Sequence, residues 1–218
     1  MNDPAAFVEE AVRRLRHDVP ERTIVAASGG IDSTVAALLA HRALGERAKA
    51  IFVDTGLLRA GEVEQVGRFF AASQLPYELV SAADLFFEAL AGVNDPEEKR
   101  RRIGAAFVRV FETEADKFHC DRLIQGTIAP DWIESGGQLR DTIKTHHNVG
   151  GIPKDMRLTL VEPLRDLYKD EVRAVARHLG VPEAERQPFP GPGLAVRVNG
   201  PITRVRVERV RIANAIVE

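Results

Sequence analysis

Short apolar runs alternate with longer helical patterns along most of this chain. Runs such as "TIVAAS" (23–28), "AKAIFVDTG" (48–56) and "RLIQGT" (122–127) are typical of strands that are buried on both faces. Helical patterns of roughly 10 to 15 residues separate several of these runs. This alternation predicts βαβ units, and therefore an α/β fold with one parallel sheet covered by helices.

The individual elements can be placed by their patterns. Proline and glycine in "PFPGPG" (188–193) end the series, because neither a helix nor a strand continues through them. Beyond them "LAVRV" alternates briefly, and the rest looks helical. We expect Asn2 or Asp3 to start the first helix at Pro4, and Asp84 to cap the fourth helix. Strands are expected at 23–28, 48–56, 77–80, 122–127 and 157–163, and helices at 4–17, 33–44, 62–73, 84–90, from 93–101 to about 117, and at 168–179.

Composition excludes several classes of protein. A chain of 218 residues can bury one full α/β core, and its net charge of −2, with both signs interspersed, argues against a duplex-DNA binder. The single cysteine, Cys120, excludes an internal disulfide framework and a Cys-x-x-Cys site. No apolar run is long enough to span a bilayer, and the N-terminus has no signal-peptide layout. We expect a cytoplasmic protein that binds neither nucleic acid nor membrane.

Polar residues stand where three of the expected strands end. Ser28, Asp54 and Gln125 each follow or close a strand. Ligands of parallel sheets bind at the carboxyl ends of the strands, so these residues are expected to converge on one site.

The stretch "SGGIDST" (28–34) follows the first strand but lacks the spacing of the common P-loop. Gly29 and Gly30 would let main-chain amides approach an anion, with help from the start of the next helix. Asp32 would repel a phosphate unless a cation such as Mg²⁺ bridged them. The plain alternative is a tight strand-to-helix turn with a Ser or Asp cap. Hydroxyl donors come from Ser28, Ser33 and Thr34.

Together with six further motifs, this turn resembles one family. "SGGIDST" looks like the pyrophosphate loop of the N-type ATP pyrophosphatases, and the whole set is similar, in order and spacing over about residues 20–200, to the ATP pyrophosphatase part of GMP synthetases. The six further motifs are "FVDTGLLR", "NDPEEKRRRIG", "QGTIAPDWIES", "IKTHHNVGGIPK", "LVEPLRDLYKDEVR" and "PFPGPGLAVRV".

The resemblance implies a fold and a division of the chain. The fold would be a Rossmann-like sheet of the adenine-nucleotide alpha-hydrolase type. Residues 1–190 would form the ATP pyrophosphatase domain, with the pyrophosphate loop at 28–34 and a lid loop at about 135–155. Residues 191–218 would be the truncated start of a C-terminal dimerisation domain, so a homodimer is expected only where the rest of that domain is present.

The resemblance also implies a reaction. The enzyme would use ATP to adenylylate the 2-carbonyl oxygen of xanthosine monophosphate, and ammonia would then displace AMP to give GMP. Mg²⁺ on Asp32 would bridge the phosphates, while the Val53 backbone and Asp54 would lie near the adenine. Gly126 would allow close backbone approach. The implied ATP-binding set is Ser28, Gly29, Gly30, Asp32, Ser33, Thr34, Val53, Asp54 and Gly126.

The implied catalytic residues lie in two later motifs. Asp131 and Glu134 would share a face if helical, although alone they read equally well as a solvated turn. Lys144 stands beside His146 and His147 in a segment flanked by pairs of glycines. Adjacent histidines point apart, so they suggest either a solvated loop or, with the lysine, charge neutralisation on a closing lid. The resemblance implies the catalytic reading for all five.

Basic residues provide the implied substrate contacts. The run "KRRR" (99–102) reads alone as a solvated helix face, but the resemblance implies that one arginine, taken as Arg102, meets the substrate phosphate. Arg197 matches a second substrate-contacting position. Lys169 reads as part of a salt-bridged surface helix or as a residue facing the site.

Only 27 residues precede Ser28, too few for the glutaminase domain of fused enzymes. Ammonia is therefore expected from a separate glutaminase subunit, or from free ammonium. Three alternatives remain at this point: an NAD synthetase, a tRNA-thiolating enzyme, for which one cysteine is unfavourable, and a non-catalytic nucleotide-binding subunit that docks a glutaminase.

Overall fold

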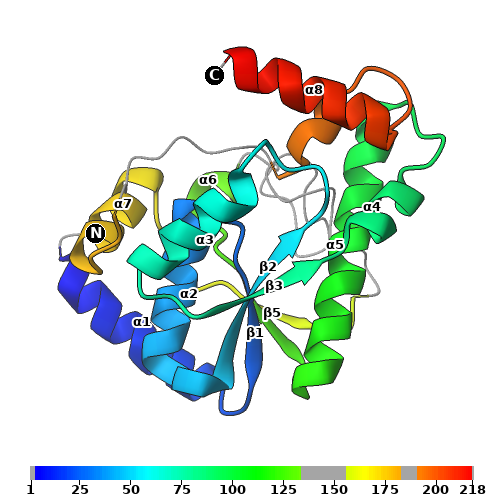
Figure 1. The fold of residues 1–218 in the computed structure, drawn as a ribbon. Coiled ribbons are helices and arrows are strands. Elements are labelled where there is room, and N and C mark those ends of the chain that lie inside the picture. The colour runs from blue at the N-terminus through cyan, green and yellow to red at the C-terminus, as the bar shows by residue number, and fades with distance from the viewer. Residues whose placement is uncertain (1–2, 134–155, 183–190, 218) are drawn as a thin grey trace.

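Parallel strands form a five-stranded sheet at the centre of the molecule (Figure 1). The structure is a computed structural model that describes residues 3–133, 156–182 and 191–217. Each neighbouring pair of strands is parallel, and the order across the sheet is β3-β2-β1-β4-β5. The predicted parallel α/β sheet is thus confirmed. The strands are β1 (Thr23–Ala26), β2 (Ala48–Asp54), β3 (Tyr77–Ser81), β4 (Arg122–Ile124) and β5 (Thr159–Val161).

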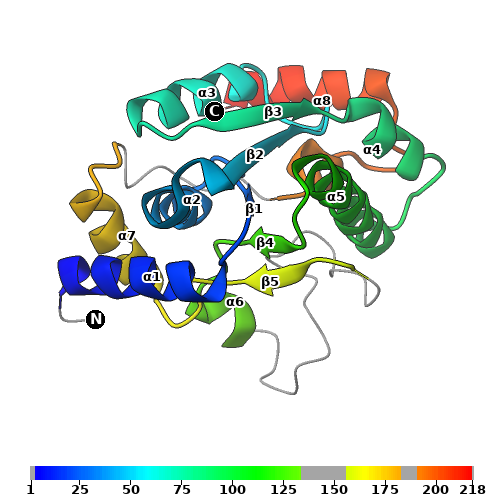
Figure 2. The ribbon, with the colours of Figure 1, turned by 90° about the horizontal axis from the view of Figure 1, so that it is seen from below.

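Helices cover both faces of this sheet (Figures 1 and 2). None of the helices within the described ranges is both long and apolar enough to cross a membrane. A short 3-10 turn, η1 (Gly45–Arg47), precedes β2, and α6 (Ala129–Ile133) follows β4. One face is covered by α1 (Pro4–Asp18), α2 (Ile31–Leu44), α3 (Glu62–Ala72) and α7 (Lys169–His178). The other is covered by α4 (Ala83–Ala89), α5 (Pro96–Phe118) and the 3-10 turn η2 (Gly193–Val196), against which α8 (Arg204–Val217) packs.

Successive side chains of the central strands β1 and β2 pack in two separate hydrophobic cores. In β1, Ile24 packs in the core beneath α5, whereas Val25 packs in the core beneath α2. The same alternation holds for Ile51 and Phe52 in β2. Because successive side chains of a strand point to opposite faces, a strand buried on both faces reads as one continuous apolar run.

Asp3 starts the first helix, as one of the two expected residues. Its side chain accepts a hydrogen bond from the Ala5 amide at 2.9 Å. Helix α2 begins at Ile31, two residues earlier than expected, because the Gly30 carbonyl already accepts the Thr34 amide at 3.1 Å.

The expected cap at Asp84 is wrong. The Ala82 amide donates to the Asp54 carbonyl at 2.9 Å, which continues the pairing of β3 with β2 to the residue just before α4. The helix therefore starts at Ala83 and leaves Asp84 inside its first turn. There the Asp84 side chain is exposed and forms an ion pair with Arg204 of α8.

The briefly alternating stretch "LAVRV" is largely a 3-10 turn in the structure. Residues Gly193–Val196 form the η2 turn, and Leu194 and Ala195 are both fully buried although they are adjacent. Both belong to the core beneath α5, which Val207 of α8 joins. The segment after the Pro-Gly motif thus packs on the main body of the molecule.

Gly126 lies where the chain leaves β4 and meets the first turn of α2. A Cβ atom at this position would lie 2.7 Å from the carbonyl carbon of Asp32 and from the amide nitrogen of Ser33. Both are helix backbone atoms, which cannot swing aside as a flexible side chain could. The missing side chain at Gly126 therefore lets β4 pack directly against the turn that follows β1.

Gly126→Ala should lower the free energy of unfolding by about 1–3 kcal/mol, because the added methyl group overpacks a backbone contact. Urea denaturation measures the change. Gly30→Ala is the matched control: its Cβ would lie 3.4 Å from Ser28 Oγ at an ordinary φ of −75°, so its effect should stay within about 0.5 kcal/mol. Equal unfolding free energies for the two variants would contradict the close-packing argument.

Candidate functional site

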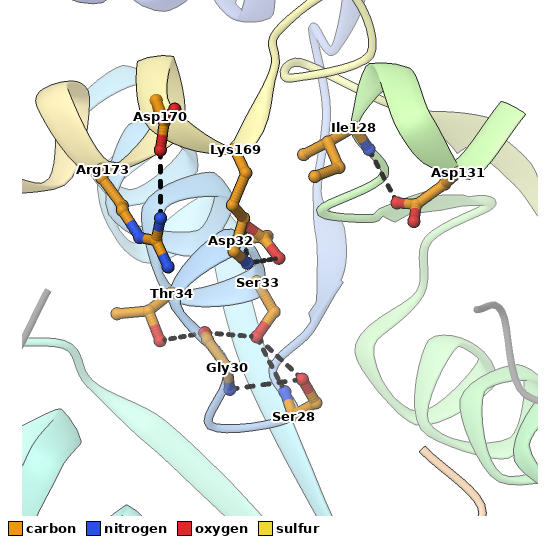
Figure 3. A network of polar contacts seen from close by, with 10 residues as sticks. All are labelled: Ser28, Gly30, Asp32, Ser33, Thr34, Ile128, Asp131, Lys169, Asp170 and Arg173. Carbon is orange, nitrogen blue, oxygen red and sulfur yellow. Dashed lines mark hydrogen bonds and ion pairs between the residues drawn. The ribbon is translucent and has the colours of Figure 1, made fainter. Parts of the chain in front are cut away.

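The turn between β1 and α2 is held together by hydroxyl groups (Figure 3). Ser33 Oγ accepts the Ser28 amide at 3.1 Å and donates to the Gly30 carbonyl at 3.0 Å. It also lies 3.0 Å from Ser28 Oγ, and because its one hydrogen is already used, Ser28 is the donor of that bond. Thr34 is fully buried, and both its amide and its hydroxyl donate to the Gly30 carbonyl. Thr34 therefore stabilises the turn as a buried residue.

The start of α2 presents backbone amides that hydrogen bonds within the helix do not use. The first amides of a helix have no acceptor within the helix, so Ile31, Asp32 and Ser33 turn their N–H groups and the positive end of the helix dipole toward the same place. Gly29, with φ +79°, adopts the left-handed conformation that glycine tolerates. A Cβ there would collide with the side chain of Val66 in α3. The sequence prediction of an anion-binding turn is consistent with this geometry.

Asp32 is joined to Lys169 across the site (Figure 3). The Lys169 ammonium donates to both carboxylate oxygens of Asp32, at 2.8 and 2.6 Å. Burial raises the pKa of Asp32 above its ordinary value, Lys169 opposes that rise, and the nearby charge of Asp131 adds to it. Lys169 is the first residue of α7 and faces the site, which decides between its two sequence readings.

Asp131 gives this part of the sheet edge a second carboxylate. It lies in α6 and accepts the Ile128 amide at 2.9 Å. No three His, Cys, Asp or Glu side chains within residues 3–133, 156–182 and 191–217 come close enough together to hold a metal ion. Mg²⁺ is usually held by one or two carboxylates plus substrate phosphates. The donor set therefore fits a Mg²⁺ ion that arrives with a phosphate chain, with Asp32 as its protein ligand.

Asp54 closes β2 beside this turn. Its carboxylate accepts the Gly56 amide at 2.8 Å, so it caps the turn that leaves the strand. Val53 is buried, with its side chain in the core beneath α5, so that only its backbone is available at the strand end. Gly126 approaches the backbone of Asp32 and Ser33, as described above.

Two basic residues near the start of α5, Lys99 and Arg102, make different contacts. Arg102 donates to Glu98 at 2.8 Å and to the Ala89 carbonyl at 3.1 Å, which ties α5 to the end of α4. Lys99 is buried and donates to the Val198 carbonyl at 2.7 Å, next to Arg197. Burial lowers the pKa of Lys99. Arg197 is exposed.

Four sequence-predicted catalytic residues, and the predicted lid at about 135–155, belong to a part of the chain that the structure does not describe. Glu134, Lys144, His146 and His147 lie outside the described residues. Two functional candidates were missed or undecided from sequence. Lys169 carried only the ambiguous signal of a charged helix start, and Lys99 was obscured by the arginines that follow it.

The described residues have the chemistry that a polyphosphate carrying a divalent cation would require. The first amides of α2 suit phosphate oxygens, and Asp32 suits the cation. Lys169 supplies positive charge at the same point. This combination serves phosphate-transfer chemistry by positioning and charge neutralisation.

Comparison with known sequences finds close relatives along nearly the whole chain. A family model described as thiamine biosynthesis protein (ThiI) matches residues 19–217. The B subunit of a glutamine-hydrolyzing GMP synthase from Thermoplasma acidophilum is 53% identical over 214 residues, which is 98% of this chain and 69% of that protein. The protein of the same name from Pyrococcus horikoshii is 56% identical over 220 residues, covering 99% and 70% respectively.

Solved structures agree on the fold. An NMN synthetase from Francisella tularensis matches with a TM-score of 0.69 and 15% identity, covering 98% of this chain and 95% of that chain. An NH3-dependent NAD synthetase from Campylobacter jejuni matches with a TM-score of 0.65 and 19% identity, over 83% and 75% respectively. These likenesses confirm the predicted adenine-nucleotide alpha-hydrolase-like fold.

Lys169→Met should lower the free energy of unfolding at pH 7 by about 1–2 kcal/mol, because it leaves the Asp32 carboxylate half-buried without its partner. The loss should shrink toward pH 4. An acid whose folded pKa is raised contributes stability below its unfolded pKa and loses it as the pH rises through the folded pKa, and without Lys169 the pKa of Asp32 rises further.

Urea denaturation at several pH values between 4 and 8 measures this dependence. Arg177→Met, on the exposed side of the same helix, is the control and should change little at any pH. A Lys169→Met effect that does not depend on pH would show that the ion pair is not its cause.

Proposed function

Because this chain belongs to the family of GMP synthase B subunits, which are PP-loop ATP pyrophosphatases, we propose that it aminates xanthosine monophosphate to GMP at the expense of ATP. As a member of this family it is a ligase and uses ATP. The observation that carries the proposal is the Asp32–Lys169 pair at the mouth of the glycine turn, where helix amides and a cation ligand converge.

ATP would bind with its β- and γ-phosphates at the turn. The amides of Ile31, Asp32 and Ser33 would donate hydrogen bonds to the phosphate oxygens. Gly29 and Gly30 have no Cβ atoms that could block the approach of the phosphates. Asp32 would hold Mg²⁺, which when bound neutralises the phosphates and supports loss of pyrophosphate. Lys169, drawn away from Asp32 as the cation arrives, would place its charge beside the departing phosphates. Ser28, Ser33 and Thr34 would keep the turn in shape through their hydrogen bonds.

The nucleoside would lie toward β2. On the β4 side, Gly126 is the other proposed ATP-binding residue at a strand end, and its backbone lies close to the first turn of α2. The Val53 backbone and Asp54, at the end of β2, are the proposed neighbours of the adenine.

Amination of xanthosine monophosphate would take two steps. The 2-carbonyl oxygen of xanthosine monophosphate attacks the α-phosphorus, and pyrophosphate leaves. Ammonia then attacks C2, and AMP departs with that oxygen to leave GMP. Residues proposed to act on these steps are Asp131, Glu134, Lys144, His146 and His147, with the segment at about 135–155 as a lid that excludes water from the adenylyl intermediate.

The substrate phosphate would meet basic residues around the start of α5. Arg102 and Arg197 are the proposed contacts. The position of Lys99 supports this assignment, because its ammonium group lies against the backbone next to Arg197. Residues 1–190 are proposed to form the ATP pyrophosphatase domain.

Ammonia would come from a separate glutaminase subunit. The relatives are named as the B subunit of a glutamine-hydrolyzing enzyme, which implies a companion chain that releases ammonia from glutamine. Free ammonium at high concentration should replace that companion chain in an assay.

The chain incubated with ATP, Mg²⁺, ammonium and xanthosine monophosphate should release pyrophosphate, AMP and GMP in equal amounts. Asp32→Asn should reduce this rate at least about 100-fold, because it removes the cation ligand from the phosphate site. Chromatography of the nucleotides and a coupled pyrophosphate assay measure both, with circular dichroism to check the fold. Pyrophosphate released only with deamido-NAD would favour an NAD synthetase, and none with any acceptor would favour a non-catalytic subunit.

The match to the ThiI model raises sulfur transfer as a competing activity, and Cys120 tests it. This thiol is the single cysteine of the chain. It is half-buried, and burial raises its pKa, which lowers the fraction of reactive thiolate. Cys120→Ser should therefore leave GMP formation within about twofold of the wild type. Loss of all nucleotide turnover in this variant, with the fold retained, would instead favour sulfur chemistry.

A further inference from the structure

Three consecutive carbonyl groups after β2 accept hydrogen bonds from the C-terminal segment. Arg211 Nη2 donates to the Gly56 carbonyl at 2.8 Å, and Arg211 Nε donates to the Leu58 carbonyl at 2.9 Å. Between them, the Leu194 amide donates to the Leu57 carbonyl at 2.7 Å. The chain that leaves β2 is therefore bound along its backbone by residues more than 130 positions later.

The β2–α3 loop (residues 55–61) borders the turn at residues 28–34, which is called the phosphate turn after its proposed role. It begins directly after Asp54 and leads into α3, whose Val66 packs where a Cβ of Gly29 would be. Its far end is fixed by Glu62, a buried carboxylate that accepts the Arg59 amide at 2.9 Å. A displacement of this loop would move both the end of β2 and the helix that supports the phosphate turn.

The shape of the Arg211 side chain suits this position. Its planar guanidinium group reaches two carbonyls with two different nitrogens, and Glu208 forms an ion pair with the third nitrogen. The side chain is 24% exposed, so these bonds are partly shielded from water. A lysine offers a single ammonium group on a flexible stem and cannot reproduce the fork.

The C-terminal segment approaches the β2–α3 loop and α4 closely at two further points. Gly193 has φ +62°, and a Cβ at this position would overlap the Leu57 carbonyl oxygen. At the other end, Arg204 lies 4.5 Å over the ring of Phe87 in α4. Helix α8 thus lies across the carboxyl edge of the sheet, above the loop that it holds (Figures 1 and 2).

We propose that Arg211 is a positioning residue for ATP: it fixes the β2–α3 loop in the shape that the nucleotide needs, without touching the nucleotide. This inference rests on the proposed function, because it takes ATP to lie across the turn and the end of β2. Loss of Arg211 should therefore weaken ATP binding and leave the chemical step largely unchanged.

The test compares Arg211→Met with Arg209→Met, a change at an exposed arginine of the same helix. Hydrogen exchange of the amides of residues 55–62, measured without nucleotide, should become faster only in Arg211→Met. The dissociation constant for Mg-ATP, by calorimetry, should rise about tenfold, as expected if the loop without Arg211 holds the binding-competent shape only about a tenth of the time. The kcat for GMP should stay within about twofold, and Arg211→Lys should recover only part of the affinity.

A destabilised control separates positioning from general loosening. Val8→Ala removes buried side-chain volume from α1, in a different core from the one that holds Leu57 and Leu194, and should lower the melting temperature without changing ATP affinity. Unchanged loop exchange or wild-type ATP affinity in Arg211→Met would overturn the inference while leaving the proposed function intact. A wild-type chain that binds no Mg-ATP would overturn the proposed function, and the inference with it.

Discussion

The turn between β1 and α2, the proposed phosphate site, is packed tightly from two sides, and the rest of the site depends on that constraint. On one side Val66 of α3 occupies the place of a Cβ at Gly29, and on the other Gly126 contacts the backbone of α2. Protein interiors are close-packed, so a single methyl group at either position would push an element away. The result is a turn whose amides are exposed to a ligand while its frame is fixed. Ser33 and Thr34 complete the frame from inside by binding the Gly30 carbonyl.

Charge at this turn is balanced before any ligand arrives. Asp32 would be costly as an isolated half-buried carboxylate, and Lys169 offsets that cost by donating to both of its oxygens. The pair joins α2 to α7, which meet on one face of the sheet. In the proposed reaction, a cation and a phosphate chain would replace this pairing with two others, one at the carboxylate and one at the ammonium. The site therefore holds its two charges in place without leaving either one unpaired.

The C-terminal segment packs on the main body of the protein and is hydrogen-bonded to the loop beside the site. Leu194 and Ala195 are buried in the core beneath α5, and Lys99 binds the Val198 carbonyl from inside that core. From this anchored base, Arg211 reaches the β2–α3 loop. Relatives named as GMP synthase B subunits share more than half of their residues with this chain across 97–100% of its length. The solved NMN and NAD synthetases, at 15% and 19% identity, share the fold.

The sequence by itself determined the parallel sheet, the turn at 28–34 and the family, and it narrowed the first helix cap to Asn2 or Asp3. These features depend on local periodicity, on short motifs and on residues close together in the chain. Tertiary structure alone decided the start of α4, the η2 turn in the briefly alternating stretch after the Pro-Gly motif, and the partners of Asp32 and of the loop after β2. Lys169 is 137 residues from Asp32, and Arg211 is 155 residues from Gly56. No local pattern encodes such pairs, because they exist only once separate helices pack on the same sheet edge.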